Sequence, residues 1–126
     1  MTFSGRSAIP ILRVFDLDKA HEFYVDYLGF TVDWNHQPDE RGPAYLQISR
    51  GALVLHLSEN HGDGTPGSGV CVPAVGVREL HAELQAKDYP FLNPGIEPSP
   101  GDERGACLHL LDPFGNKLFI DERAKD

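Results

Sequence analysis

The sequence contains one strand–helix pattern twice, and this repeat constrains the fold more than any other feature. Apolar, β-branched runs at 9–14 and 70–75 predict a strand at the start of each copy. The segments 14–30 and 75–91, which continue these strands, have equal length. The chain is therefore predicted to be a tandem of two similar modules.

Each copy continues into a predicted helix and then into further strands. In the first copy Asp16 is the predicted N-cap and Gly29 ends the helix, whose apolar positions are Ala20, Phe23, Tyr24, Tyr27 and Leu28. In the second copy the apolar positions are Val77, Leu80 and Leu84, and the helix is predicted to end near Tyr89-Pro90. Later strands are expected at 31–34, 45–48, 53–57, 107–111 and 118–120.

These elements predict an α+β fold of tandem βαβββ modules, with curved, largely antiparallel sheets around a hollow. Residues 1–126 are expected to form a single domain. Module one covers about 8–60, a glycine-rich linker about 61–68, and module two about 69–122.

Strand alternation assigns side chains to the two faces of each sheet. The face under the helices is expected to carry Leu53, Leu55, Leu57, Leu118 and Ile120. The opposite face is predicted to line the hollow, and its expected members are Ile9, Ile11, Arg13, Val54, His56, Ser58, Val70, Val72, Ala74, Lys117, Phe119 and Asp121. Any ligand is expected to contact this set.

Composition restricts the partners. The formal net charge of -8 disfavours nucleic acid and anionic membrane surfaces and favours a cationic ligand, although an acidic surface can serve solubility alone. No basic and apolar leader and no long apolar run is present, so a cytoplasmic location is expected. Cys71 and Cys107 lie in apolar runs and are predicted to be buried, unpaired thiols.

Three segments together resemble the vicinal-oxygen-chelate superfamily, which includes glyoxalase I, dioxygenases and bleomycin-resistance proteins. These are Ser7–Leu12, the helix end Tyr27–Phe30, and the turn Asp112–Asn116. Enzymes of the superfamily carry metal ligands at places that fall here on Ile9, His56, Val70 and Phe119. Three of these four side chains cannot ligate a metal, so no metal, cofactor or catalytic residue is assigned.

Within the superfamily, Ser7–Leu12 and Asp33-Trp34 look most like the bleomycin-resistance branch. The resemblance implies a homodimer that sequesters a cationic glycopeptide antibiotic in grooves at its interface, with Asp33 and Trp34 contacting the drug. Where that branch often has Trp-Gly-Arg, this chain has Arg104-Gly105-Ala106. Either the ligand differs from bleomycin, or Arg104 turns outward and the negative field from Asp33, Glu59 and Asp63 dominates.

The predicted ligand-binding residues are Asp33, Trp34, Tyr45, His56, Ser58 and Phe119. Three of them have a second interpretation: Trp34 as a core or interface residue, Asp33 as a solvated charge, and His56 as a general base rather than a hydrogen-bonding wall. Gln47 lines the same groove if Tyr45 does. Three functions remain open: antibiotic sequestration for resistance, a metal-dependent lyase, isomerase or dioxygenase, and binding of an unknown metabolite.

Overall fold

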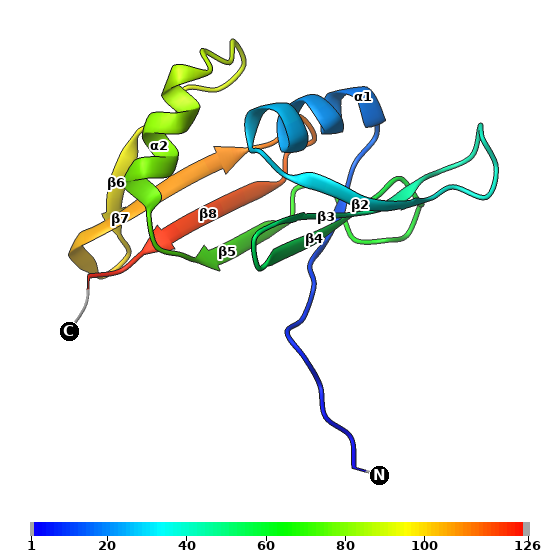
Figure 1. The fold of residues 1–126 in the computed structure, drawn as a ribbon, viewed down its shortest axis with the longest axis horizontal. Helices are drawn as coiled ribbons and strands as arrows, with labels where there is room; N and C mark the ends of the chain where they lie inside the picture. The colour runs from blue at the N-terminus through cyan, green and yellow to red at the C-terminus, as the bar shows by residue number, and fades with distance from the viewer. Residues whose placement is uncertain (1, 125–126) are drawn as a thin grey trace.

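The computed structural model describes residues 2–124, which form two four-stranded sheets lying side by side (Figure 1). Module one contains β1 (Ile11–Arg13), α1 (Leu17–Ala20) continued by the π-helix η1 (His21–Tyr27), β2 (Thr31–His36), β3 (Tyr45–Arg50) and β4 (Leu53–Ser58). Module two contains β5 (Gly69–Pro73), α2 (Val77–Ala86), β6 (Ile96–Ser99), β7 (Asp102–Leu111) and β8 (Lys117–Glu122). The α+β class and the tandem βαβββ architecture are confirmed.

The two sheets have the same topology. The strand orders are β1-β4-β3-β2 and β5-β8-β7-β6, and in each sheet the first strand pairs parallel with the last while the other pairs are antiparallel. Both helices lie on one side of the sheets (Figure 1). We call the other side the outer face. None of the helices in residues 2–124 is long and apolar enough to cross a membrane.

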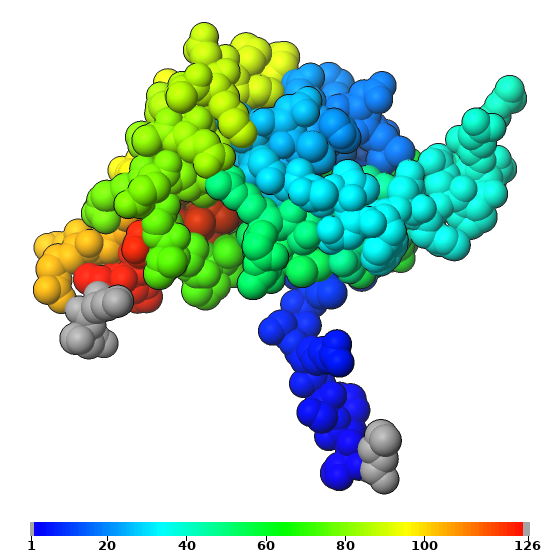
Figure 2. Space-filling model, viewed as in Figure 1, coloured from blue at the N-terminus to red at the C-terminus, as the bar shows by residue number. Residues whose placement is uncertain are grey.

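The N-terminal segment leaves the body of the protein. Residues 2–9 are exposed, and the segment projects from the outer side, away from the helices (Figures 1 and 2). Phe3 is 93% exposed within it. A large apolar side chain this exposed is typical of a segment that packs against a partner molecule.

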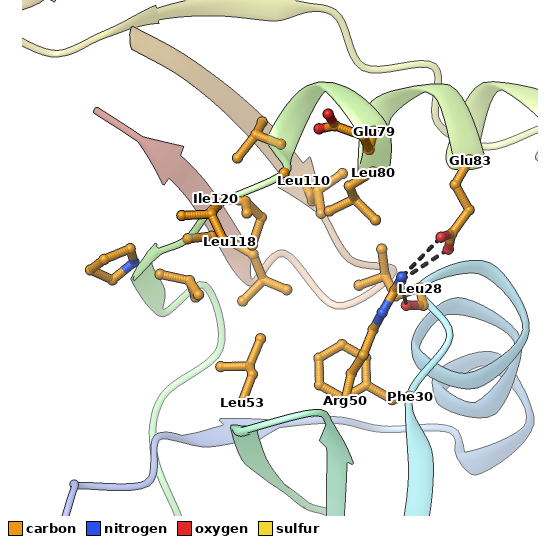
Figure 3. A pocket seen from close by; sticks show the side chains of 16 residues that line it. Leu28, Phe30, Arg50, Leu53, Glu79, Leu80, Glu83, Leu110, Leu118 and Ile120 are labelled. Atoms are coloured by element: carbon orange, nitrogen blue, oxygen red, sulfur yellow. Dashed lines mark hydrogen bonds and ion pairs between the residues drawn. The ribbon is translucent and has the colours of Figure 1, made fainter. Parts of the chain in front are cut away.

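A charged bridge joins the two modules on the helix side (Figure 3). Both guanidinium nitrogens Nη1 and Nη2 of Arg50, at the end of β3, donate to the Glu83 carboxylate of α2 at 2.9 Å. Arg50 Nη1 also donates to the Leu28 carbonyl at the end of the first helix. This bidentate pair fixes the β3–β4 turn relative to α2.

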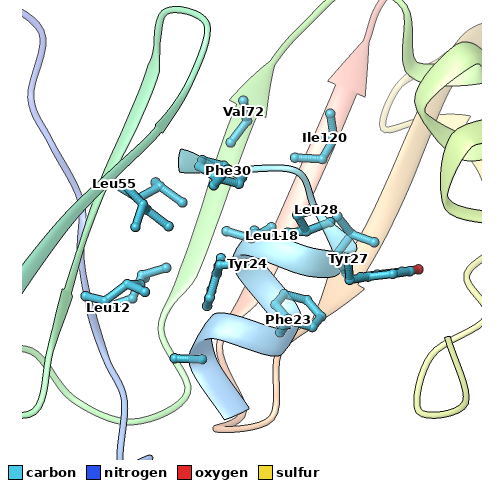
Figure 4. Packing of buried hydrophobic residues seen from close by; sticks show 14 of the residues in the cluster. Leu12, Phe23, Tyr24, Tyr27, Leu28, Phe30, Leu55, Val72, Leu118 and Ile120 are labelled. Atoms are coloured by element: carbon cyan, nitrogen blue, oxygen red, sulfur yellow. The ribbon is translucent and has the colours of Figure 1, made fainter. Parts of the chain in front are cut away.

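The core is continuous across both modules (Figure 4). The first helix lies between the sheets and presents aromatic side chains to both of them. Phe23 and Tyr24 are fully buried and contact each other edge to face, with ring centroids 4.9 Å apart. Asp16 caps this helix as predicted, accepting from two backbone N–H groups.

The face assignment was right in module one and wrong for β5. The predicted helix-side residues Leu55, Leu57, Leu118 and Ile120 are buried. Val72, predicted to line the hollow, pairs with Ile120 and is buried in the same core, and Val70 and Ala74 also pack there. The outward residue of β5 is Cys71, paired with Phe119, so the expectation that Cys71 is buried was wrong, whereas Cys107 is buried.

Candidate ligand-binding face

Four strands place one row of side chains across the outer face of the first sheet. The strand register aligns Ile11 of β1 with His56 of β4, His56 with Gln47 of β3, and Gln47 with Trp34 of β2. Tyr45 lies two residues before Gln47 and so shares this face. The predicted residues Trp34, Tyr45 and His56 are therefore neighbours, contributed by three strands.

A β-bulge brings the fourth predicted residue, Asp33, to the same face. Adjacent residues of a regular strand point to opposite sides, which would separate Asp33 from Trp34. The β2–β3 register shifts between Val32 and Trp34, leaving Asp33 as the extra residue. Its carboxylate accepts hydrogen bonds from Gln47 Nε2 at 3.1 Å and Ser49 Oγ at 2.9 Å, both from β3.

The polar groups of this face form one hydrogen-bonded chain. Gln47 donates to Asp33 through its amide nitrogen, and its Oε1 lies 3.0 Å from His56 Nε2. His56 Nδ1 lies 2.7 Å from the Tyr45 hydroxyl. Because the amide oxygen can only accept, Nε2 carries the imidazole proton and Tyr45 donates to Nδ1. Both ring nitrogens of His56 thus form hydrogen bonds within the protein, as expected if His56 is a hydrogen-bonding wall of the groove.

The surroundings of His56 and Tyr45 keep these two side chains uncharged at neutral pH. Partial burial lowers the pKa of His56 below its ordinary value of 6.5, because water no longer solvates the imidazolium well. Burial, together with the negative charge of Asp63, raises the pKa of Tyr45. At neutral pH His56 is therefore an uncharged imidazole and Tyr45 a protonated phenol.

Three aromatic rings form the apolar part of the face. The Trp34 and Tyr45 rings are nearly parallel, at 12° with centroids 6.0 Å apart. The His56 ring meets both edge to face, at 5.3 Å from Trp34 and 5.1 Å from Tyr45. Trp34 is 43% exposed, so one ring face remains open to a ligand. Such a surface suits a flat ring, and a cation adjacent to it.

The structure separates the other two predicted residues from this group. Ser58 is completely buried, because Asn60 and the linker residue Asp63 fold against it: its hydroxyl donates to Asp63 at 2.8 Å and accepts from the Asn60 N–H at 3.0 Å. It is not available to a ligand in this arrangement. Phe119 lies on the second sheet, where its ring packs edge to face on His109 with centroids 4.9 Å apart.

Sequence reasoning missed Ser49, which holds Asp33 in place, and it named Asp63 only as part of the negative field, not as the partner of Ser58. Ser49 could have been found by alternation, since it lies two residues after Gln47 in the same strand. Asp63 lies in the glycine-rich linker, where no periodic signal exists.

The side chains do not fit the metal centre of the superfamily's enzymes. The register pairs His56 with the apolar Ile11 and Phe119 with Cys71. Of the four places that the resemblance gave to metal ligands, Ile9, Val70 and Phe119 have no donor atom, and the two nitrogens of His56 are already hydrogen-bonded. Within residues 2–124 of one chain, no three His, Cys, Asp or Glu side chains gather as metal ligands.

Known structures share this fold across nearly the whole chain. A bleomycin resistance determinant encoded on transposon Tn5 has a TM-score of 0.71 at 20% identity, covering 96% of this chain and 100% of its own. The bleomycin-binding protein of Streptomyces verticillus, solved with copper(II)-bleomycin, has a TM-score of 0.69 at 24% identity, covering 99% and 100%. A lactoylglutathione lyase from Agrobacterium tumefaciens has a TM-score of 0.67 at 20% identity, covering 94% and 95%.

The three structures include both binding proteins and an enzyme, so the shared fold does not by itself choose between these functions. No curated protein matches the sequence. The family described as "Glyoxalase superfamily protein" matches residues 2–126. This match confirms the superfamily to which the repeat, the helix ends and the Asp112–Asn116 turn pointed, and the chain belongs to the glyoxalase superfamily.

Proposed function

We propose that this protein binds a small molecule that carries both a positive charge and a flat ring, of the bleomycin kind, on the outer face of the first sheet. The observation that carries the proposal is the juxtaposition of Asp33 and Trp34 by the β2 bulge. It sets a fixed carboxylate beside an open aromatic ring.

The carboxylate is held but not neutralised. Gln47 and Ser49 are uncharged donors, and within residues 2–124 no basic side chain forms an ion pair with Asp33. The net charge of -8 adds an attractive field for a cation. The ring wall of Trp34, Tyr45 and His56 supplies dispersion and cation–π contact.

Binding rather than turnover is favoured by the state of His56. A general base needs a nitrogen lone pair directed at the substrate, yet Nδ1 accepts from Tyr45 and Nε2 donates to Gln47. The similarity of the fold to bleomycin-binding proteins supports the same proposal. The biological role of such binding would be to sequester an antibiotic and so confer resistance.

Titration of bleomycin against tryptophan fluorescence tests the proposal directly, because Trp34 is the single tryptophan of the chain. We expect saturable quenching and a raised melting temperature. Trp34→Ala, followed by the melting temperature, is expected to reduce the shift clearly, whereas Phe91→Ala, at an exposed aromatic on another surface, leaves it intact. If high micromolar bleomycin changes neither signal, antibiotic sequestration fails and a metabolite of other chemistry becomes the candidate.

A further inference from the structure

A second cavity lies on the helix side, between the two modules (Figure 3). It has a volume of about 330 Å³, within the range of small-molecule sites. Its wall is formed by leucine, isoleucine and phenylalanine side chains of both modules, among them Phe30, Leu53, Leu80, Leu110 and Leu118. In the space-filling view, atoms of β8 are visible at the bottom of a recess beside α2 (Figure 2).

The cavity exists because α2 does not cover the sheet along its whole length. Val77 and Leu84 of the helix are buried, while Leu80 between them is only half-buried and lines the opening. The Arg50–Glu83 bridge spans the gap between the β3–β4 turn and the helix. It holds the two walls at this separation instead of letting them collapse onto each other.

The charges at the opening favour a cation. The guanidinium of Arg50 is neutralised by Glu83, whose carboxyl pKa is lowered by that hydrogen bond. Glu79, one turn earlier on α2, also lines the cavity, and within residues 2–124 no hydrogen bond or ion pair engages its carboxylate. Glu83 is shared by Arg50 and, at 3.7 Å, by Lys87, so within residues 2–124 Glu79 is the carboxylate of the cavity lining without a partner, above an apolar interior.

From this arrangement we propose that the inter-module cavity is a second binding site, for an aliphatic primary amine. The hydrocarbon chain lies among Leu53, Leu80 and Leu118, and the ammonium group faces Glu79. An alcohol of equal length gains the apolar contacts only, and a carboxylate is repelled. The site is on the opposite side of the sheets from Trp34, so it stands independently of the function proposed above.

Methyl-detected NMR of the full chain, titrated with n-octylamine, n-octanol and n-octanoate at low salt, tests this site. We expect octylamine to shift the Leu80, Leu110 and Leu118 methyl signals at the lowest concentration. Octanol should require a higher concentration to produce the same shifts, and octanoate the highest. Glu79→Gln is expected to weaken octylamine binding about two- to five-fold, the range of an exposed ion pair, and to leave octanol unchanged. Glu40→Gln, which removes one charge from an exposed loop, should change neither.

A cavity-filling change gives a second test. Leu53→Trp places a large ring at the opening and is expected to weaken both octylamine and octanol at least about tenfold, which corresponds to losing about 1.4 kcal/mol of contact. Methyl signals outside the cavity that match those of the wild-type protein would show that the Leu53→Trp variant is folded. Equal affinities for octylamine and octanol, shifts confined to Ile11 and its neighbours on the outer face, or no shift at millimolar amine would each overturn the proposal.

Discussion

The Tyr24 hydroxyl, in the first helix, donates to Asp112 Oδ2 in the last turn of module two at 2.6 Å. The same carboxylate accepts from the Phe114 and Asn116 backbone N–H groups and from the Asn116 side chain, each at 2.8 Å. Asn116 in turn donates to the Arg13 carbonyl of β1. A buried carboxylate with four donors thus ties the two modules together, and burial and the charge of Asp112 raise the pKa of Tyr24, keeping it a donor.

Removing the Tyr24 hydroxyl is therefore expected to destabilise the whole fold. Tyr24→Phe keeps the ring in the core but takes one donor from a buried charge, which costs about 1–3 kcal/mol of unfolding free energy. Urea unfolding measures the loss. Tyr27→Phe, one turn later, is the matched control with an expected change below about 0.5 kcal/mol. Equal losses in the two variants would mean that the bond to Asp112 adds nothing.

The salt dependence of ligand binding should distinguish the contribution of the Asp33 charge from that of the Trp34 ring. The Debye length falls from about 10 Å at 0.1 M salt to about 3 Å at 1 M, so the affinity of the wild-type protein for bleomycin should fall as salt rises. Asp33→Asn is expected to flatten this dependence. Trp34→Ala should instead lower affinity by about 1–2 kcal/mol at every salt concentration, as isothermal titration calorimetry would measure. A wild-type affinity that does not depend on salt would contradict the role of Asp33.

The lowered pKa of His56 predicts a loss of stability in mild acid. Between the folded pKa and the ordinary value of 6.5, the unfolded chain binds more protons than the folded one. The stability that His56 contributes is thus complete above that window and declines as the pH falls through it. The urea midpoint should drop more between pH of about 7.5 and about 5.5 in the wild-type protein than in His56→Gln. His21→Gln, at an exposed histidine, should behave as the wild type does.

The projecting N-terminal segment predicts a homodimer in which it reaches the partner. The outer faces expose Ile9, Ile11, Trp34 and Leu111, a set of apolar side chains that one chain leaves uncovered. Light scattering of the full chain is expected to give twice the 13.9 kDa monomer mass. Deleting residues 1–7 should raise the dissociation constant of the dimer. A monomer mass for the full chain at micromolar concentration would refute the dimer.

The side chains at the positions where the superfamily's enzymes carry metal ligands predict that the purified protein holds no stoichiometric divalent metal. Ile9, Val70 and Phe119 offer no lone pair, and His56 alone does not complete a catalytic site. Elemental analysis measures this. One zinc, nickel or iron per chain, lost on His56→Ala but retained in His21→Ala, would contradict the prediction and revive the enzyme hypothesis.

The parts of the fold that the sequence predicted are those with strong local signals. Asp16 and Gly29 mark the first helix because a side-chain cap and a positive φ, here 76° at Gly29, are chemically specific. β6 (Ile96–Ser99) was missed because Pro94, Gly95 and Pro98 interrupt any strand pattern. Its pairing with β7 comes from tertiary contact, which no local window reports.

The outward-facing side of β5 could not be predicted from the sequence for a different reason. Val70, Cys71, Val72 and Ala74 are all small and apolar, so alternation gives no contrast between the two sides. The structure also aligns the two copies one residue differently from the equal segments 14–30 and 75–91. The N–H groups of Val14 and Ala74 donate to equivalent residues of β4 and β8, Ser58 and Asp121. Leu12 is therefore equivalent to Val72. In β3 the sequence left the face of Tyr45 and Gln47 open, and the structure decides it: Leu46 and Ile48 are buried, so Tyr45 and Gln47 share the outer face.

The extra residue in β2 makes the candidate site sensitive to strand length as well as to side-chain identity. Loss of a single residue between Val32 and Asn35 would restore regular pairing and leave room for only one of Asp33 and Trp34 on the outer face. Among relatives that diverge by small insertions and deletions, the number of residues in this strand would then sort those that can present a carboxylate beside an indole from those that cannot, even when both residue types survive.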